Sequence, residues 1–63
     1  MRFHYTATED NAPYRQMRIR VKKTDDPSRP MVDIEDEAEE IAHARAKQAL
    51  GTDEFTLILD DAR

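Results

Sequence analysis

Two stretches near the start of the chain alternate between apolar and polar positions. From Met1 to Thr8 the odd positions are apolar, and from Gln16 to Lys23 the apolar residues Met17, Ile19 and Val21 are separated by polar and basic ones. A period of two is typical of β-strands, which we place at residues 1–8 and 14–23. Because only the polar segment 9–13 separates them, we expect an antiparallel hairpin.

The register that we expect in this hairpin pairs residues whose numbers add to 22. Phe3 would then face Ile19, and Tyr5 would face Met17. On the other face His4 would lie opposite Arg18. A slip of two residues would leave every side chain on the same face of the sheet, because the side-chain period of a strand is also two.

The segment 34–50 has the spacing of an amphipathic helix. Acidic residues crowd its first turns, where the helix dipole favours negative charge, and Asp33 is the expected N-cap. Gly51 is expected just beyond the last turn. The predicted apolar stripe is Ile34, Ala38, Ile41, Ala42, Ala49 and Leu50. Arg45 falls within this stripe, and we interpret it as a packed stem with its charge in water, or alternatively as an ion-pair or site residue.

Residues 54–60 alternate again, which predicts a third strand. The order strand, strand, helix, strand predicts a single α+β domain over residues 1–63. Since crossovers are right-handed, we expect a three-stranded mixed sheet in the order 2-1-3 with one helix on one face, its third strand antiparallel to the first and parallel to the second. The residues expected beneath the helix are Met1, Phe3, Tyr5, Met17, Ile19, Val21, Phe55, Leu57 and Leu59.

Size and composition narrow the functional classes. The 63 residues contain no cysteine, which excludes disulfides and thiolate metal sites and fits a reducing compartment. The chain has no apolar run long enough for a transmembrane helix or a signal peptide, and its alternation starts at Met1. We therefore expect a cytoplasmic protein without a cleaved leader.

Charge is segregated along the chain. Residues 1–23 carry six Arg and Lys against two acids, whereas residues 24–63 carry four against twelve. On the sheet face away from the helix, a basic cluster would be displayed, consisting of Arg2, His4, Arg18, Arg20 and Lys22. Clustered arginines suit carboxylates or phosphates, which guanidinium groups bind bidentately. An ordinary solvated sheet face is the alternative.

Nucleic acid is a second candidate ligand for this basic face. Sheets that bind RNA usually interleave aromatic residues with basic ones so that bases can stack. The exposed positions here offer no Phe, Tyr or Trp, apart from Tyr14 at the start of the second strand, and the helix is acidic. An acidic protein partner is therefore favoured over RNA or DNA.

The predicted helix carries a second charged surface on its outer side, with Asp36, Glu37 and Glu40 as its candidate binding residues. One interpretation is a surface for a basic partner or a partial mimic of a phosphate backbone, and the other is a solvated helix face. Glu40 and His43 are spaced for metal binding, but no second motif completes a coordination shell, so we expect no metal and no cofactor.

Catalytic chemistry is poorly represented. The single serine, Ser28, lies in a predicted loop, and Gly51 is the single glycine, so no glycine-rich phosphate loop exists. We expect a non-enzymatic protein-binding module, a regulator or inhibitor of a larger cytoplasmic complex of the kind that phages and mobile elements encode. The alternative is an RNA- or DNA-binding module that uses the basic sheet face. Homodimerisation through the edge strand 14–23 is compatible with both.

Overall fold

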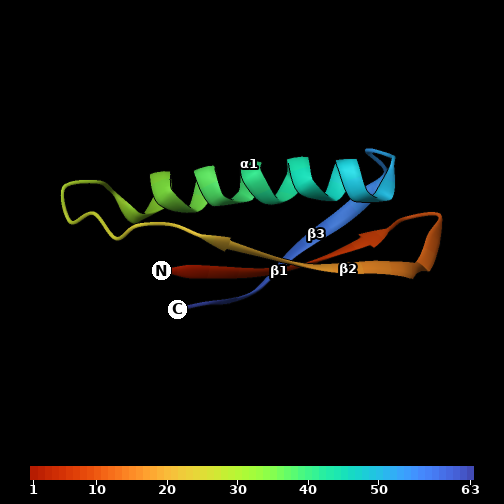
Figure 1. Ribbon diagram of the computed structural model, residues 1–63, viewed down its shortest axis with the longest axis horizontal. Coiled ribbons are helices and arrows are strands. Elements are labelled where there is room, and N and C mark those ends of the chain that lie inside the picture. Colours follow the sequence, from red (N-terminus) through yellow and green to blue (C-terminus); the bar gives the residue numbers. More distant parts are fainter.

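The computed structural model describes all 63 residues and contains four elements. They are β1 (Arg2–Glu9), β2 (Ala12–Lys22), α1 (Met31–Leu50) and β3 (Phe55–Ala62). The predicted α+β class and the element order are confirmed. Figure 1 shows the helix lying along one side of the sheet, with the two chain ends close together.

The sheet has the predicted strand order, with β1 between β2 and β3. Both of its pairings are antiparallel, so the expected mixed sheet is wrong. The outer strands β2 and β3 do run in the same direction, but β1 separates them. No parallel ladder can therefore form between them.

The expected hairpin register is wrong by two residues. Phe3 faces Val21 and Tyr5 faces Ile19, so the numbers of paired residues add to 24. Glu9 pairs with Ala12 across the turn, but Thr8 pairs with Gln16, so residues 13–15 of β2 have no partner in β1. These three extra residues shift the rest of the ladder from numbers that add to 21 at the turn to numbers that add to 24. Because the slip is even, the basic side chains stay on the predicted face.

The core lies between α1 and the β1–β2 half of the sheet. Its buried residues are Phe3, Tyr5, Ala7, Ile19, Val21, Ile34, Ala38, Ala42, Ala46 and Leu50. The helical members are spaced by four, and three of them are alanines, which lets the helix backbone approach the strands closely. Ala46 was missing from the predicted stripe, whereas Ala49 is exposed and Ile41 only half-buried.

The two ends of α1 differ in how well they were predicted. The helix begins at Met31 instead of residue 34, and Pro30 precedes it without a side-chain capping bond, so the N-cap assigned to Asp33 is wrong. Proline is tolerated at a helix start, where its missing N–H has no intrahelical partner. Gly51 ends the helix as predicted: its φ is 74°, and its N–H donates to the Lys47 carbonyl at 2.9 Å.

The helix is not centred on the sheet. It packs mainly against β2 and, to a lesser extent, β1, while β3 crosses at an angle to both (Figure 1). Phe55 and Leu57 of β3 are consequently only half-buried, and Leu59 is 46% exposed although it was expected beneath the helix. The helix side of β3 therefore remains partly uncovered.

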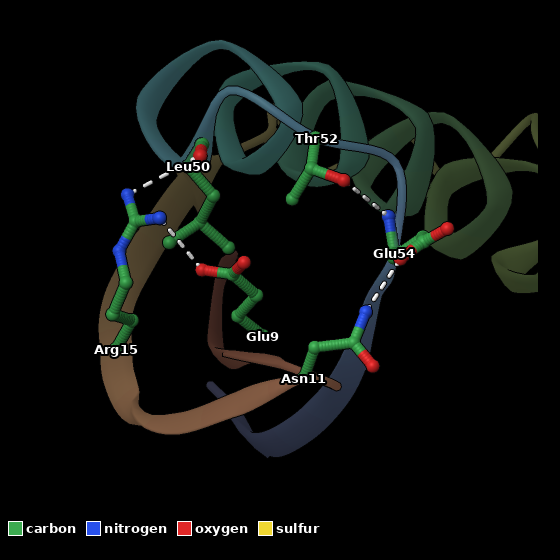
Figure 2. A network of polar contacts seen from close by, with 6 residues as sticks. All are labelled: Glu9, Asn11, Arg15, Leu50, Thr52 and Glu54. Carbon is green, nitrogen blue, oxygen red and sulfur yellow. Dashed lines mark hydrogen bonds and ion pairs between the residues drawn. The ribbon is translucent and has the colours of Figure 1, made fainter.

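A polar network joins the hairpin turn to the loop after α1. Figure 2 shows Arg15 reaching both the Glu9 carboxylate, at 2.8 Å, and the Leu50 carbonyl, at 3.2 Å. Asn11 in the turn donates to the Glu54 carboxylate at 2.5 Å. These bonds fix the last turn of the helix and the start of β3 relative to the hairpin.

Candidate functional site

The face of the sheet opposite α1, which we call the open face, gathers the predicted basic cluster. Arg2 lies directly opposite Lys22, and His4 lies opposite Arg20, with Arg18 as the next basic residue along β2. Like charges that face each other across strands destabilise a sheet. The fold therefore keeps this cluster against an electrostatic cost.

The ion pairs of the protein leave the open face out almost entirely. Of the ten Lys and Arg residues, five form ion pairs within the chain. These pairs are Arg15–Glu9, Lys23–Glu37, Arg29–Glu37, Lys47–Asp53 and Arg63–Asp61. Arg45 donates from Nη1 to the Arg20 carbonyl at 2.9 Å. Arg45 therefore has a backbone partner but no anionic one. The other four cations without an anionic partner are Arg2, Arg18, Arg20 and Lys22, and all four lie on the open face.

The open face is hollow. A depression of about 560 Å³ is lined by His4, Arg18 and Arg20, together with residues of β3 and the neighbouring backbone. A second depression of about 380 Å³ adjoins it and is lined by Arg2, Lys22 and Arg63 as well as His4 and Arg20. Unpaired cations thus surround a concave surface that is open to solvent.

Alternation along residues 54–60 already places Asp60 on the open face, and a β-bulge in β3 adds Asp61, which sequence reasoning missed. Tyr5 pairs with Leu59 and His4 pairs with Asp61, which leaves Asp60 as the extra residue. Both Asp60 and Asp61 consequently line the larger depression instead of alternating between faces. The break of alternation after Leu59 was the available signal, but the predicted strand ends at residue 60, before Asp61.

Both bulge carboxylates have partners within the chain. Thr6 donates its hydroxyl to Asp60 at 2.5 Å, and Arg63 donates to Asp61. The hydrogen bond and charge of Arg63, with a smaller contribution from His4, hold the pKa of Asp61 below its usual range. The bulge therefore leaves the unpaired cations on β1 and β2 unneutralised.

The acidic helix face is divided by the structure into two groups. Glu37 contacts Lys23 at 3.0 Å and also Arg29, and these hydrogen bonds lower its pKa to about 2. Glu37 thus ties α1 to the preceding loop. Asp36 and Glu40, the other two predicted residues, have no ion pair or hydrogen bond. The acids without a partner are Asp33, Glu35, Asp36, Glu39 and Glu40, and all five lie on α1.

Two residues singled out in the sequence take packing roles. Arg45 is exposed and reaches from α1 to the backbone of β2, so it tethers the helix to the edge strand. His43 stacks at a tilt on Phe55, with ring centroids 4.8 Å apart, and so joins α1 to β3. No group of three His, Asp or Glu side chains is arranged to hold a metal ion.

Comparison with protein-family models, with curated proteins and with solved structures gave no match to this chain. No helix in the structure combines the length with the apolar character that crossing a membrane requires.

Proposed function

We propose that the protein is a small binding module whose open face docks on an acidic surface of a partner protein. The observation that carries this proposal is the gathering of Arg2, Arg18, Arg20 and Lys22, four of the five cations without an anionic partner, around one hollow surface. Carboxylates of a partner would supply the missing counter-charges. Each guanidinium can donate two parallel hydrogen bonds to one carboxylate.

A protein surface suits the open face better than a nucleic acid does. Asp60 and Asp61 lie on this face, so a continuous phosphate backbone that crosses the whole sheet would meet two like charges. No Phe, Tyr or Trp side chain other than Tyr5, which is buried in the core, borders either depression, and the exposed Tyr14 lines neither of them. A partner protein can instead place carboxylates over β2 and hydrogen-bond donors over the bulge.

Such a module would act by covering the surface that it binds. Charge complementarity speeds encounter and disfavours wrong partners. A bound module would cover an acidic functional surface on a larger cytoplasmic complex and so regulate or inhibit that complex. The acidic character of the rest of the chain would keep the module from binding polyanions indiscriminately.

The test is a pair of double variants with equal changes in charge. Arg18→Gln/Arg20→Gln removes two open-face cations, while Arg29→Gln/Lys47→Gln removes two cations elsewhere. We expect the first to weaken binding to a polyglutamate peptide by about tenfold, since paired charges at an interface dominate such contacts. The control variant should bind like the wild type. Affinity capture from the native host should lose the partner with the first variant alone.

The same measurement distinguishes the nucleic-acid alternative. Single-stranded and double-stranded probes are titrated against the protein at low salt and again at high salt. Binding to these probes that is stronger than binding to polyglutamate, falls steeply with salt and needs Arg18 and Arg20 would contradict the proposal in favour of nucleic acid. Equal binding by both double variants would show that the open face is not the site.

A further inference from the structure

The two edges of the sheet are protected to very different degrees. The outer strand β2 carries a proline and, towards its end, a cation at every second position, both of which discourage pairing with another chain. The outer strand β3 (Phe55–Ala62) contains no proline, lysine or arginine. It pairs only with β1, so its other edge is free, and before the bulge at Asp60 it offers the regular backbone of residues 55–59 to an added strand.

Strand β3 also exposes apolar side chains on both of its faces. Ile58 on the open face is 53% exposed, and Leu59 on the helix side is 46% exposed. The exposure of Leu59 follows from the placement of α1, which packs over β2 and β1 and leaves β3 only partly covered, whereas Ile58 is exposed because no element covers the open face. The bulge and the two aspartates protect only the end of this edge, and the stretch 55–59, with apolar residues on both faces, is a template for strand addition.

A groove runs between α1 and β3 on the helix side. Its depression of about 150 Å³ has an apolar floor of Tyr5, Leu57 and Leu59, and the helix lines it with Glu35, Asp36 and Glu39. A shallower depression of about 370 Å³ continues along the helix past Glu40 and His43. The helix side of this groove therefore presents only unpaired carboxylates and one histidine.

The electrostatic state of the floor agrees with this placement. Burial raises the pKa of the Tyr5 hydroxyl, and the charges of Glu39 and Glu35 raise it further. The carboxylates of α1 are thus close enough to Tyr5 to impose a negative potential where the groove meets the core.

We propose that the free edge of β3 accepts an extended segment of a partner protein as a fourth strand, and that this segment carries Arg or Lys at alternate positions. The basic side chains would face α1, with their aliphatic stems on Leu57 and Leu59 and their charges at Asp36 and Glu39. The intervening apolar residues would cover Ile58 on the open face. This site lies on a different edge from the basic cluster and does not depend on the function proposed above.

A second copy of the chain fits the same edge poorly. The charged residues from Glu54 to Asp61 are all acidic. Two β3 strands paired about a two-fold axis would therefore bring carboxylates of one copy towards those of the other, which destabilises a sheet. A basic segment from another protein meets the same carboxylates with opposite charge.

The test is an NMR titration of the isotope-labelled protein with a capped peptide of eight residues, which matches β3 in length and alternates Arg with Val. We expect amide shifts concentrated in β3 and in the facing side of α1. Methylating one alternate set of peptide amides should abolish binding, whereas methylating the other set should not, because only one set faces β3. A peptide that alternates Glu with Val should not bind.

Variants then assign the charge contacts. Asp36→Asn/Glu39→Gln should weaken binding of the Arg–Val peptide by about fivefold, as expected for two partly exposed ion pairs. The matched control, Asp25→Asn/Asp33→Asn, removes the same charge outside the groove and should bind like the wild type. Arg18→Gln/Arg20→Gln should also bind normally, which separates this site from the one on the open face.

Three outcomes would overturn the proposal. Amide shifts confined to the open face would place the peptide elsewhere, and equal binding by both N-methylated peptides would exclude strand addition. Concentration-dependent self-association that broadens the β3 amides without peptide would show that a second copy occupies the edge instead.

Discussion

Glu37 joins the loop before α1 to the helix itself. Its carboxylate receives charged hydrogen bonds from Lys23 and Arg29, so that one acidic side chain holds both ends of the 23–30 connection. The connection contains two prolines, which limit its conformations in the unfolded chain as well. These contacts of Glu37 matter because they help to set where α1 begins relative to β2.

The low pKa of Glu37 predicts that its ion pairs with Lys23 and Arg29 lose their contribution to stability in acid. Its pKa is about 2 in the folded protein against the usual 4.5, so the pair stabilises the fold above pH 4.5. This contribution should be lost as the pH falls from 4.5 towards 2. Thermal unfolding followed by circular dichroism across this range should show a smaller pH dependence for Glu37→Gln than for the wild type. If stability depends on pH equally in Glu37→Gln and in the wild type, the ion pairs of Glu37 do not contribute to the pH dependence.

The control for this experiment is Glu40→Gln, because Glu40 lies on the same helix but has no partner. Its pH dependence should follow that of the wild type. Asp26 and Asp61 also have lowered pKa values, through hydrogen bonds from Ser28 and Arg63 respectively. Both variants retain these two groups, so the difference between them isolates Glu37.

At the scale of elements, the end of α1 at Gly51 can be tested by substitution. Nothing lies within 4 Å of the position that a Cβ atom would occupy there, so the cost of Gly51→Ala comes from its φ of 74° alone. We expect Gly51→Ala to destabilise the fold by about 1 kcal/mol and Gly51→Asn by less, since Asn adopts this conformation more readily. Urea unfolding measures both. Equal losses for the two variants would contradict a backbone origin.

Alternation predicted the elements and their faces better than their pairing. Which face Phe3 or Arg20 occupies depends only on period two, so it survived the wrong register. The register itself depends on residues 13–15 of β2, which have no partner in β1, and alternation alone does not show where a ladder is interrupted. The bulge at Asp60 was not predicted for a similar reason: a residue is recognised as extra only once its strand is aligned with the partner strand.

The candidate site, like the fold, was predictable only in part. The members of the basic cluster came directly from the alternation, and they remain together on the open face. Which charges are free could not be read from the sequence, because Glu37 and Arg63 acquire partners only through the fold. The exposure of Leu59 was not predicted either, because it depends on where the helix lies across the sheet.

Across the whole molecule, the unpaired charges are sorted onto opposite sides. Apart from Arg45, which donates to a backbone carbonyl, the Lys and Arg side chains without an anionic partner lie on the open face, and the unpaired carboxylates lie on the helix. A separation of this kind orients a charged partner before contact and increases the rate of productive encounter at low salt. The same separation concentrates like charges, which should make the basic side a source of instability.

This cost predicts a trade between binding and stability in the Arg18→Gln/Arg20→Gln variant. Arg20 lies opposite His4 and between two other cations of β2, so its removal relieves repulsion. We expect the variant to be more stable than the wild type by a few tenths of a kcal/mol at low salt, and the gain to vanish at high salt. Thermal melts at the two salt concentrations measure the gain. A loss of stability at low salt would show that these arginines stabilise the fold.

The position of β1 in the middle of the sheet has a consequence for the timing of folding. This strand is made first, and its hairpin partner β2 follows within a few residues, but β3 comes from the far end of the chain. The sheet therefore combines a local contact, which closes rapidly, with one that spans most of the sequence and is slow to close. During synthesis, β1 must wait with one edge open until residues 55–62 have left the ribosome.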